Sequence, residues 1–389
     1  MGKIQNTHLI GCVLFLKVMS DMFYQIQVLD ILLLAVLGLN LVYMVFTQKL
    51  RFCVCDVLIA LMGVLFTVSF LKDMAYYRDY VKLISAFMLY FWGRYHYRTA
   101  DAVSQTLLWA YFIAFLVNIV CCITGNGTVV WGSAVTYRGM YYFKTDFTAM
   151  IAFFTVFYFV KDRKFTAIDY VLLVLAGVFT VLANTRIYYM IYSVLLCCVW
   201  LYKRNDKLLT WKSITWIVVF AMIGVLSVVI LPRLPFFADR QMISLEADNM
   251  TSNLQGRNNI WGPLFQTFGE QNLLTQLFGA GLSFNDTYGL AGFDEHSLYV
   301  KTILNTGYVG MLLWVAFLIL IVYYLGKEKN RRTSFQCAML IGIYSVAGIS
   351  ACTNLFTSTS WFPLLYCGMI CGIEKSSGFP ESVGNHEAE

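Results

Sequence analysis

Long apolar runs fill most of this sequence and constrain its fold more than any other feature. The runs of membrane-spanning length, or slightly less, are 8–24, 27–47, 52–71, 79–96, 104–124, 145–160, 167–183, 186–202, 213–231, 300–324, 335–352 and 354–373. Of the 389 residues, 59% are hydrophobic and only 13% are charged, whereas a soluble chain carries about 25% charged residues. The sequence therefore predicts an all-α polytopic membrane protein with about twelve transmembrane helices.

Basic residues predict how these helices are oriented. Those at 161–164 and 202–212 flank 167–202 on both sides, so this interval is predicted to be a hairpin of two short spans. More than half of the 28 Lys and Arg residues fall in one set of alternate loops, most of them short. The positive-inside rule then gives cytoplasmic N- and C-termini, one transmembrane domain over 1–373 and a cytoplasmic tail over 374–389. The first span is predicted to remain uncleaved.

The long polar interval 232–299 becomes a large extracellular or periplasmic loop between the ninth and tenth predicted helices. Pro232 ends the ninth helix, because proline cannot continue one. Apolar residues inside the loop recur at helical spacing, at Ile260, Trp261, Leu264, Phe265 and Phe268. This pattern predicts a short amphipathic helix on the membrane surface. Since no GxxxxGK[ST] motif occurs, a reaction outside would need an already activated substrate.

Two arginines are candidates for binding an anion outside the membrane. Arg186 follows Asn184 and Thr185, a good N-cap for the eighth helix. The positive end of that helix and a permanent cation would together suit a phosphate. Arg257 begins the amphipathic helix in the same manner, and the two arginines together could hold a diphosphate. The alternatives are a snorkelling arginine at 186 and an ordinary solvated arginine at 257.

His296 is the only histidine predicted to lie on the exterior side. With Asp294 as N-cap, it is predicted in the first turn of the tenth helix. The helix N-terminus favours a neutral imidazole that can accept a proton, whereas Asp294 and Glu295 act in the opposite direction. His296 is thus either a general base for an alcohol acceptor or a capping, structural histidine.

Further side chains of the exterior side are candidates for substrate binding. Arg138 and Lys144 either extend the cationic site or anchor the membrane interface. Trp261 and Tyr299 either stack on sugars or belong to an aromatic belt.

Other patterns in the sequence give no reason to predict a metal, a cofactor or a nucleic-acid partner. The eleven cysteines lie in or beside apolar runs without a CxxC motif, so they are interpreted as small buried hydrophobes. Glu246 and Asp248 have no set of His or Cys partners on the exterior side that would complete a metal site. The HxxxxD pattern at 96–101 falls in a short cytoplasmic connection. The net charge of +6 is attributed to membrane orientation.

Several short motifs, in this order along the chain, resemble the O-antigen polymerase and ligase superfamily. The matching segments are YRGMYYFKTDFTAM (137–150), NTRIYYMIYSVLL (184–196), GRNNIWGPL (256–264), LFGAGLS (277–283) and EHSLYVKTILNTGYVGMLL (295–313). Members of that family are metal-independent, multi-pass glycosyltransferases. They act on the outer face of the bacterial cytoplasmic membrane and use sugars linked to undecaprenyl diphosphate.

The resemblance implies a function and a role for each main candidate. Arg186 and Arg257 would bind the diphosphate leaving group, and His296 would activate or orient the acceptor hydroxyl in an inverting transfer. The expected activity is polymerisation of lipid-linked repeat units into O-antigen or capsular polysaccharide. Its partners would be lipid-linked donor and acceptor oligosaccharides, membrane lipid, a flippase and a chain-length regulator.

Two alternative functions stay open. A ligase would transfer the glycan to a lipid or protein acceptor, using the same helices, loop and charges. A transporter of lipid-linked oligosaccharide or polysaccharide would have Arg186 in its substrate pathway, and such folds usually contain an internal repeat. No repeat is detectable in this sequence.

Overall fold

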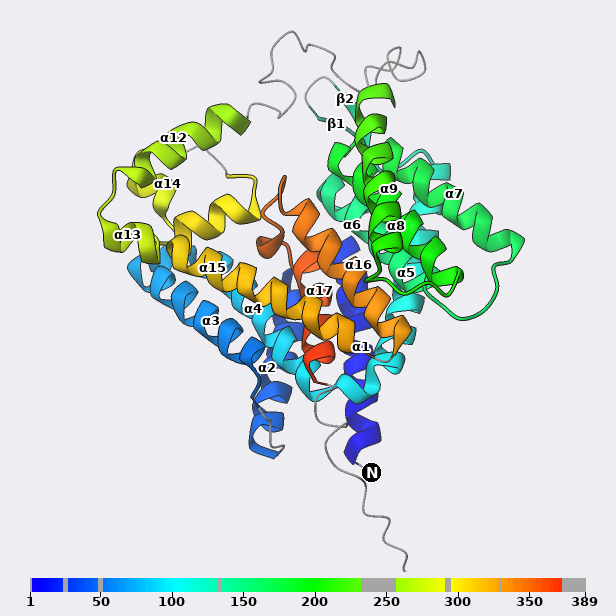
Figure 1. Ribbon diagram of the computed structural model, residues 1–389, viewed down its shortest axis with the longest axis horizontal. Coiled ribbons are helices and arrows are strands. Elements are labelled where there is room, and N and C mark those ends of the chain that lie inside the picture. The colour runs from blue at the N-terminus through cyan, green and yellow to red at the C-terminus, as the bar shows by residue number, and fades with distance from the viewer. Residues whose placement is uncertain are drawn as a thin grey trace, which may run out of the picture.

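The computed structural model describes residues 2–23, 27–47, 52–131, 134–231, 257–290, 295–328 and 330–372, and these are mostly helical (Figure 1). The long helices are α1 (Gly2–Met22), α2 (Gln27–Thr47), α3 (Val54–Lys72), α4 (Tyr77–Tyr95), α5 (Ala100–Ile123), α6 (Lys144–Phe159), α7 (Ala167–Leu182), α8 (Arg186–Lys203), α9 (Trp211–Ile230), α15 (Leu298–Lys327), α16 (Arg331–Ala347) and α17 (Thr357–Cys371). Each predicted apolar run therefore corresponds to one of these helices.

Shorter elements connect the long helices. They are β1 (Thr128–Trp131), β2 (Ala134–Tyr137), α12 (Arg257–Gly269), α13 (Leu273–Phe278), α14 (Phe284–Thr287) and the 3₁₀ turns η1 (Met74–Tyr76), η2 (Tyr97–Thr99) and η4 (Thr353–Leu355). The two strands form an antiparallel hairpin that pairs Thr128 with Tyr137. The sequence had given no indication of these strands.

Among the residues that the structure describes, five helical segments are long and apolar enough to cross a membrane. They are Val28–Thr47, Val54–Lys72, Tyr97–Ile123, Trp211–Val228 and Leu298–Lys327. Large apolar side chains also cover the outside of the bundle, and on α2 Leu39 is 72% exposed and Phe46 is 85% exposed. Such surfaces suit lipid and would be unfavourable in water. The chain is accordingly a helical membrane protein.

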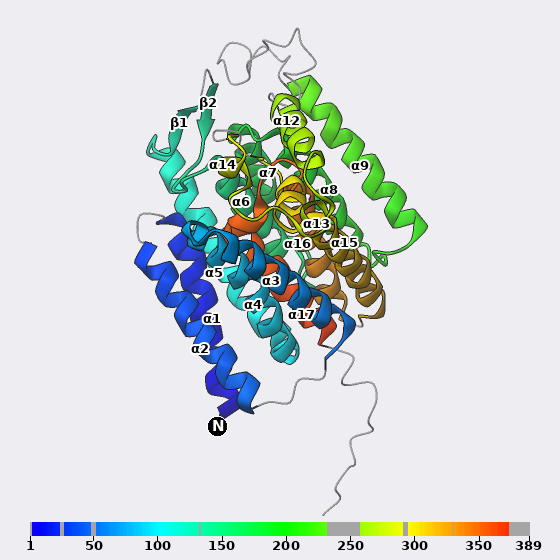
Figure 2. The same ribbon diagram turned by 90° about the vertical axis from the view of Figure 1, so that its left-hand side faces the viewer.

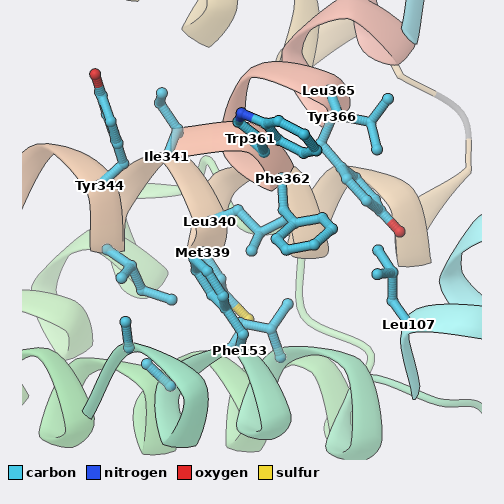
Figure 3. Close-up of a cluster of buried hydrophobic side chains, with 14 of the residues drawn as sticks. Leu107, Phe153, Met339, Leu340, Ile341, Tyr344, Trp361, Phe362, Leu365 and Tyr366 are labelled. Carbon is cyan, nitrogen blue, oxygen red and sulfur yellow. The ribbon is translucent and has the colours of Figure 1, made fainter. Parts of the chain in front are cut away.

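Helices α6 and α17 form the centre of the bundle. From Phe147 to Phe159 every residue of α6 is buried, as is every residue of α17 from Thr359 to Cys371. Phe362 of α17 points toward Phe153 of α6, with ring centroids 6.0 Å apart in an edge contact (Figure 3). Each such pair contributes roughly 0.5–1.5 kcal/mol beyond the burial of its area. In Figure 2, α1 and α2 lie at one side of this centre and α9 at the other.

The amphipathic helix predicted within the long loop is confirmed as α12. Its Leu264 and Phe268 are fully buried against Phe284, Val300 and Leu304. The helix was expected to lie on the membrane surface, but Leu264 and Phe268 pack against α14 and the beginning of α15. The loop residues 232–256, with Pro232, Glu246 and Asp248, lie outside the described part of the chain, as does the tail from 373 onward.

Candidate functional site

Two predicted cations meet at the beginnings of α6 and α8. Lys144 is the first residue of α6 and Arg186 the first residue of α8, and both are half-buried. The Lys144 Nζ donates a hydrogen bond to the backbone oxygen of Asn184, at 3.4 Å. Lys144 is also close enough to Arg186 for their positive charges to repel each other. Two like charges and two positive helix ends at one point favour the binding of an anion.

The α7–α8 turn fixes Arg186 through local backbone geometry. Asn184 has a φ of 49°, a left-handed conformation that asparagine tolerates better than most residues. The Tyr189 hydroxyl lies 3.5 Å from the Asn184 Oδ1 and 3.4 Å from the Val181 oxygen. Thr185 is the N-cap residue, as predicted, but its hydroxyl bonds the Ala183 oxygen and not a helix N–H group. The turn itself therefore orients Arg186.

Arg138 stabilises the segment that leads into α6. Its Nη1 donates a hydrogen bond to the backbone oxygen of Tyr142 at 2.8 Å. The same segment is attached to α5, because the Asn118 Oδ1 accepts a hydrogen bond from the Met140 N–H at 3.0 Å. One clear contact of Arg138 is thus internal to the 138–142 turn.

His296 lies just before α15, in a strained backbone conformation. The helix begins at Leu298 with Ser297 as N-cap, so the prediction that His296 lies in the first helical turn is wrong. The predicted cap, Asp294, lies outside the described residues. His296 is exposed and has a φ of 46°, which is uncommon for a residue with a side chain and often marks a functional site.

Firm contacts hold the residues on both sides of His296. The indole Nε1 of Trp261 donates to the Glu295 backbone oxygen at 2.7 Å. On the other side, the Leu298 N–H and the Ser297 hydroxyl both donate to the Gly348 oxygen, at 2.8 and 3.2 Å. These contacts fix the chain before and after His296. Trp261 therefore positions the histidine segment through its N–H group.

A charged cluster beside His296 was missed by sequence analysis. The Glu295 carboxylate is buried; it accepts a hydrogen bond from the Asn285 amide at 3.1 Å and lies 3.6 Å from the Lys301 Nζ. Lys301 is also 3.9 Å from the Asp79 carboxylate. The only sign of this cluster in the sequence was Lys301 at the beginning of an apolar run. Its other members Asp79 and Asn285 are remote in sequence, so their proximity could not be predicted.

The neighbouring turns are joined by a further polar contact. Tyr76 of η1 donates a hydrogen bond to the Asp286 carboxylate of α14. This bond, together with burial, raises the pKa of Tyr76 to about 12. The phenol therefore stays protonated and remains a donor at neutral pH.

A close backbone crossing connects the LFGAG and NTG motifs. α15 is interrupted at Gly307, whose φ of 69° and ψ of −171° are not helical. Gly307 contacts the backbone of Leu277 and Phe278, and Gly279 contacts the backbone of Asn305. The Ala280 N–H also donates to the Leu304 oxygen at 2.9 Å. The motifs on which the resemblance depends are thus packed against each other, and they set the direction of the helical segment that follows His296.

The segment that follows α16 contacts both parts of the site. Gly348 accepts hydrogen bonds from Ser297 and Leu298, as described above. Further along, the Phe356 ring lies 5.8 Å from the ring of Phe143, which precedes Lys144. The Ser358 hydroxyl donates to the Asp146 carboxylate at 2.9 Å. The cationic pair and the His296 segment therefore lie at the same end of the bundle.

The remaining predicted residues have different surroundings. Arg257 is the first residue of α12, and its side chain lies outside the described part of the structure. Tyr299 is half-buried and its hydroxyl donates to the Ser345 oxygen at 2.8 Å, so it attaches α15 to α16. Of the predicted residues, Lys144 thus joins Arg186, and Trp261 joins the His296 segment.

A second group of charges lies deeper in the bundle. Lys17 is fully buried, 2.5 Å from Asp21 and 3.1 Å from Asp30. Asp21 also lines a small cavity with Asp146, and the other lining residues are Val18, Tyr111, Tyr141, Met150 and Ser358. Charged side chains within a helical membrane protein are costly, and they often mark a functional site.

Comparison of the sequence with protein-family models and with curated proteins gives no match. The motifs and the geometry of the site are therefore the basis for a functional assignment.

Proposed function

We propose that this protein polymerises undecaprenyl-diphosphate-linked oligosaccharide repeat units into O-antigen or capsular polysaccharide. The observation that supports this most is the pair of cations, Lys144 and Arg186, at two helix N-termini at the same end of the bundle as the exposed His296. Such an arrangement suits a diphosphate leaving group. It also combines that anion site with a side chain able to accept a proton.

In this proposal all twelve helices span the bacterial cytoplasmic membrane, with both termini in the cytoplasm and 232–299 outside. Basic residues at the opposite end of the bundle support this orientation. There the Lys203 Nζ donates to the Arg163 oxygen at 2.8 Å, and the Arg331 Nη1 donates to the Asn205 Oδ1 at 2.9 Å. An excess of such residues in short loops is typical of the cytoplasmic side.

The proposed reaction is a displacement at the anomeric carbon of the donor sugar. The acceptor hydroxyl forms a bond to that carbon while the bond from the carbon to the diphosphate oxygen breaks. The oxygen leaves with the electron pair, and Arg186 and Lys144 stabilise its negative charge. His296 accepts the hydroxyl proton. By the resemblance, Arg257 adds a further positive charge to the leaving group.

The buried charges around Lys17 favour a second candidate, a transporter of lipid-linked oligosaccharide. A titratable network that borders a cavity between helices is typical of ion-coupled transport. In that case Arg186 would bind the diphosphate of a substrate that crosses the membrane intact.

A reconstitution experiment separates these functions. Purified protein in liposomes receives a lipid-linked repeat unit alone, and the products are separated by size. A polymerase gives a ladder of longer lipid-linked chains without a flippase or a chain-length regulator. A ladder that forms only after addition of a second lipid or protein acceptor would indicate a ligase. Movement of the intact unit across the bilayer without any new glycosidic bond would refute the proposal in favour of transport.

Trp261 provides a test of how the His296 segment is positioned. The Trp261→Phe variant retains an aromatic ring but loses the hydrogen bond to the Glu295 oxygen. Because one such bond contributes about 0.5–1.5 kcal/mol, we expect the polymerisation rate to fall roughly 3- to 10-fold, with a melting temperature only slightly lower than that of the wild-type protein. The matched control is Trp211→Phe, at a side chain that is 86% exposed. An unchanged rate in Trp261→Phe would show that this contact does not position the site.

A further inference from the structure

Three cysteine sulfurs converge at the end of the bundle opposite to Arg186. The Sγ atoms of Cys53, Cys55 and Cys371 all lie within 4.8 Å of one another. Cys53 and Cys55 flank the first residue of α3, and Cys371 is the last residue of α17. The chain thus brings together sulfurs from near its two ends.

A buried ion pair fixes the backbone around these cysteines. The Asp56 carboxylate accepts a hydrogen bond from the Cys53 N–H at 2.8 Å. The same carboxylate binds the Arg94 guanidinium through two bonds of 2.7 and 2.9 Å, and the Arg94 Nη1 also donates to the Cys371 oxygen. Asp56 and Arg94 therefore link the backbone N–H group of Cys53 to the backbone oxygen of Cys371. A cluster built in this manner needs little rearrangement to act as a unit.

The cluster is buried on one side and open on another. Cys55 and Cys371 are buried, whereas Cys53 is half-buried and the adjacent Phe52 is 75% exposed. An ion can therefore approach past Cys53. Arg94 is paired with Asp56, so this ion pair orders the backbone beside the cluster without adding net charge to it.

We propose that Cys53, Cys55 and Cys371 bind one thiophilic d¹⁰ metal ion, with Zn²⁺ as the reference case. Zn–S bonds of about 2.3 Å in tetrahedral geometry require sulfurs roughly 3.8 Å apart. Since the sulfurs lie within 4.8 Å of one another, side-chain rotations that shorten each separation by at most about 1 Å bring the three to this distance. Soft thiolate ligands select Zn²⁺ or Cu⁺ over Mg²⁺ or Ca²⁺. The bound ion connects the beginning of α3 to the end of α17.

The expected consequence is greater stability of the folded chain. A ligand that binds only the folded state stabilises it in proportion to the logarithm of its concentration relative to Kd. The cluster lies away from Lys144, Arg186 and His296, so its metal takes no part in the proposed glycosyl transfer.

Titration with Cd²⁺ tests this site on the reduced, metal-free, full-length protein. We expect thiolate-to-cadmium charge-transfer absorption that saturates at one ion per chain, together with a higher melting temperature. Removal of partners outside the ligand set costs about 10- to 100-fold in metal affinity, so Cys371→Ser, which removes a ligand, should lower Cd²⁺ affinity by at least about 100-fold. Excess Zn²⁺ should displace Cd²⁺ from the wild-type protein.

Control variants make the outcome specific to these three sulfurs. Cys197→Ser changes a buried cysteine elsewhere in the bundle and should leave Cd²⁺ binding unchanged. If Cys371→Ser does not fold, Cys53→Ser, at the half-buried position, provides the same test. Absence of the absorption band, or equal binding in the wild-type protein and both cluster variants, would overturn the proposal and leave the cysteines as packed thiols.

Discussion

Replacing Arg186 by alanine is expected to lower the rate of repeat-unit polymerisation by about 100- to 1,000-fold. One group that stabilises developing charge on a leaving oxygen commonly contributes this much. The loss should appear in kcat, because the charge on the diphosphate oxygen grows as the bond to the sugar breaks. The measurement is chain extension by purified protein in liposomes, with a lipid-linked repeat unit as substrate.

Variants at neighbouring positions distinguish charge from structure. Arg186→Lys retains the charge and should recover part of the rate. Lys144→Ala should also slow the reaction, and the double variant should lose less than the product of the two effects, because both cations act on one anion. Arg204→Ala, at an arginine of the opposite end that is 3.4 Å from Asp206, is the control and should retain full activity. Wild-type rates in Arg186→Ala would exclude the proposed site.

The helices could be predicted from the sequence because lipid leaves the backbone few alternatives. Within a bilayer each N–H and C=O group needs a partner in its own segment, so a long apolar run forms a helix. The ambiguous interval 167–202 was correctly divided into α7 and α8, since charge required the chain to return to the same side. The predicted break falls at Asn184, where the structure has a left-handed turn.

Features that depend on contacts between remote segments could not be predicted in this way. The interruption of α15 at Gly307 requires the backbone of Leu277, and the sequence shows a continuous apolar run there. The cysteine cluster similarly requires Cys371 beside Cys53 and Cys55. The spacing of residues along the sequence does not predict either contact, because both depend on how the helices pack.

For the same reason, only part of the candidate site could be predicted. Arg186 and Lys144 were recognised separately as cations near helix ends, and the structure brings them together through Asn184. The helix after His296 was predicted to begin a few residues too early, because α15 begins at Leu298 with Ser297 as its N-cap. The buried partners Glu295 and Lys301 were not recognised as a pair, since their contact depends on how the chain folds before α15.

Alanine at Gly279 or Gly307 is expected to cause the largest loss of stability among the substitutions considered. Both residues have positive φ values, 87° and 69°, in regions of the backbone map that only glycine adopts easily. A Cβ atom at Gly279 would overlap the carbonyl group of Asn305, and one at Gly307 would overlap that of Leu277. Backbone strain of about 1–3 kcal/mol would add to this overlap, so we expect a total cost of roughly 3 kcal/mol or more.

Alanine variants at two other glycines separate the loss of stability caused by backbone strain from the loss caused by steric overlap. Gly289 has a φ of 69° but nothing within 4 Å of the position that a Cβ atom would take, and Gly342 is in α16 with equally open space. Gly289→Ala should therefore show the strain alone, and Gly342→Ala should be neutral or slightly stabilising, since alanine favours a helix. In detergent, the melting temperature should be highest for Gly342→Ala, lower for Gly289→Ala, and lowest for Gly279→Ala and Gly307→Ala. Equal stability of Gly279→Ala and Gly289→Ala would mean that the two motifs do not cross as closely as described, and the support for the His296 segment would then need another origin.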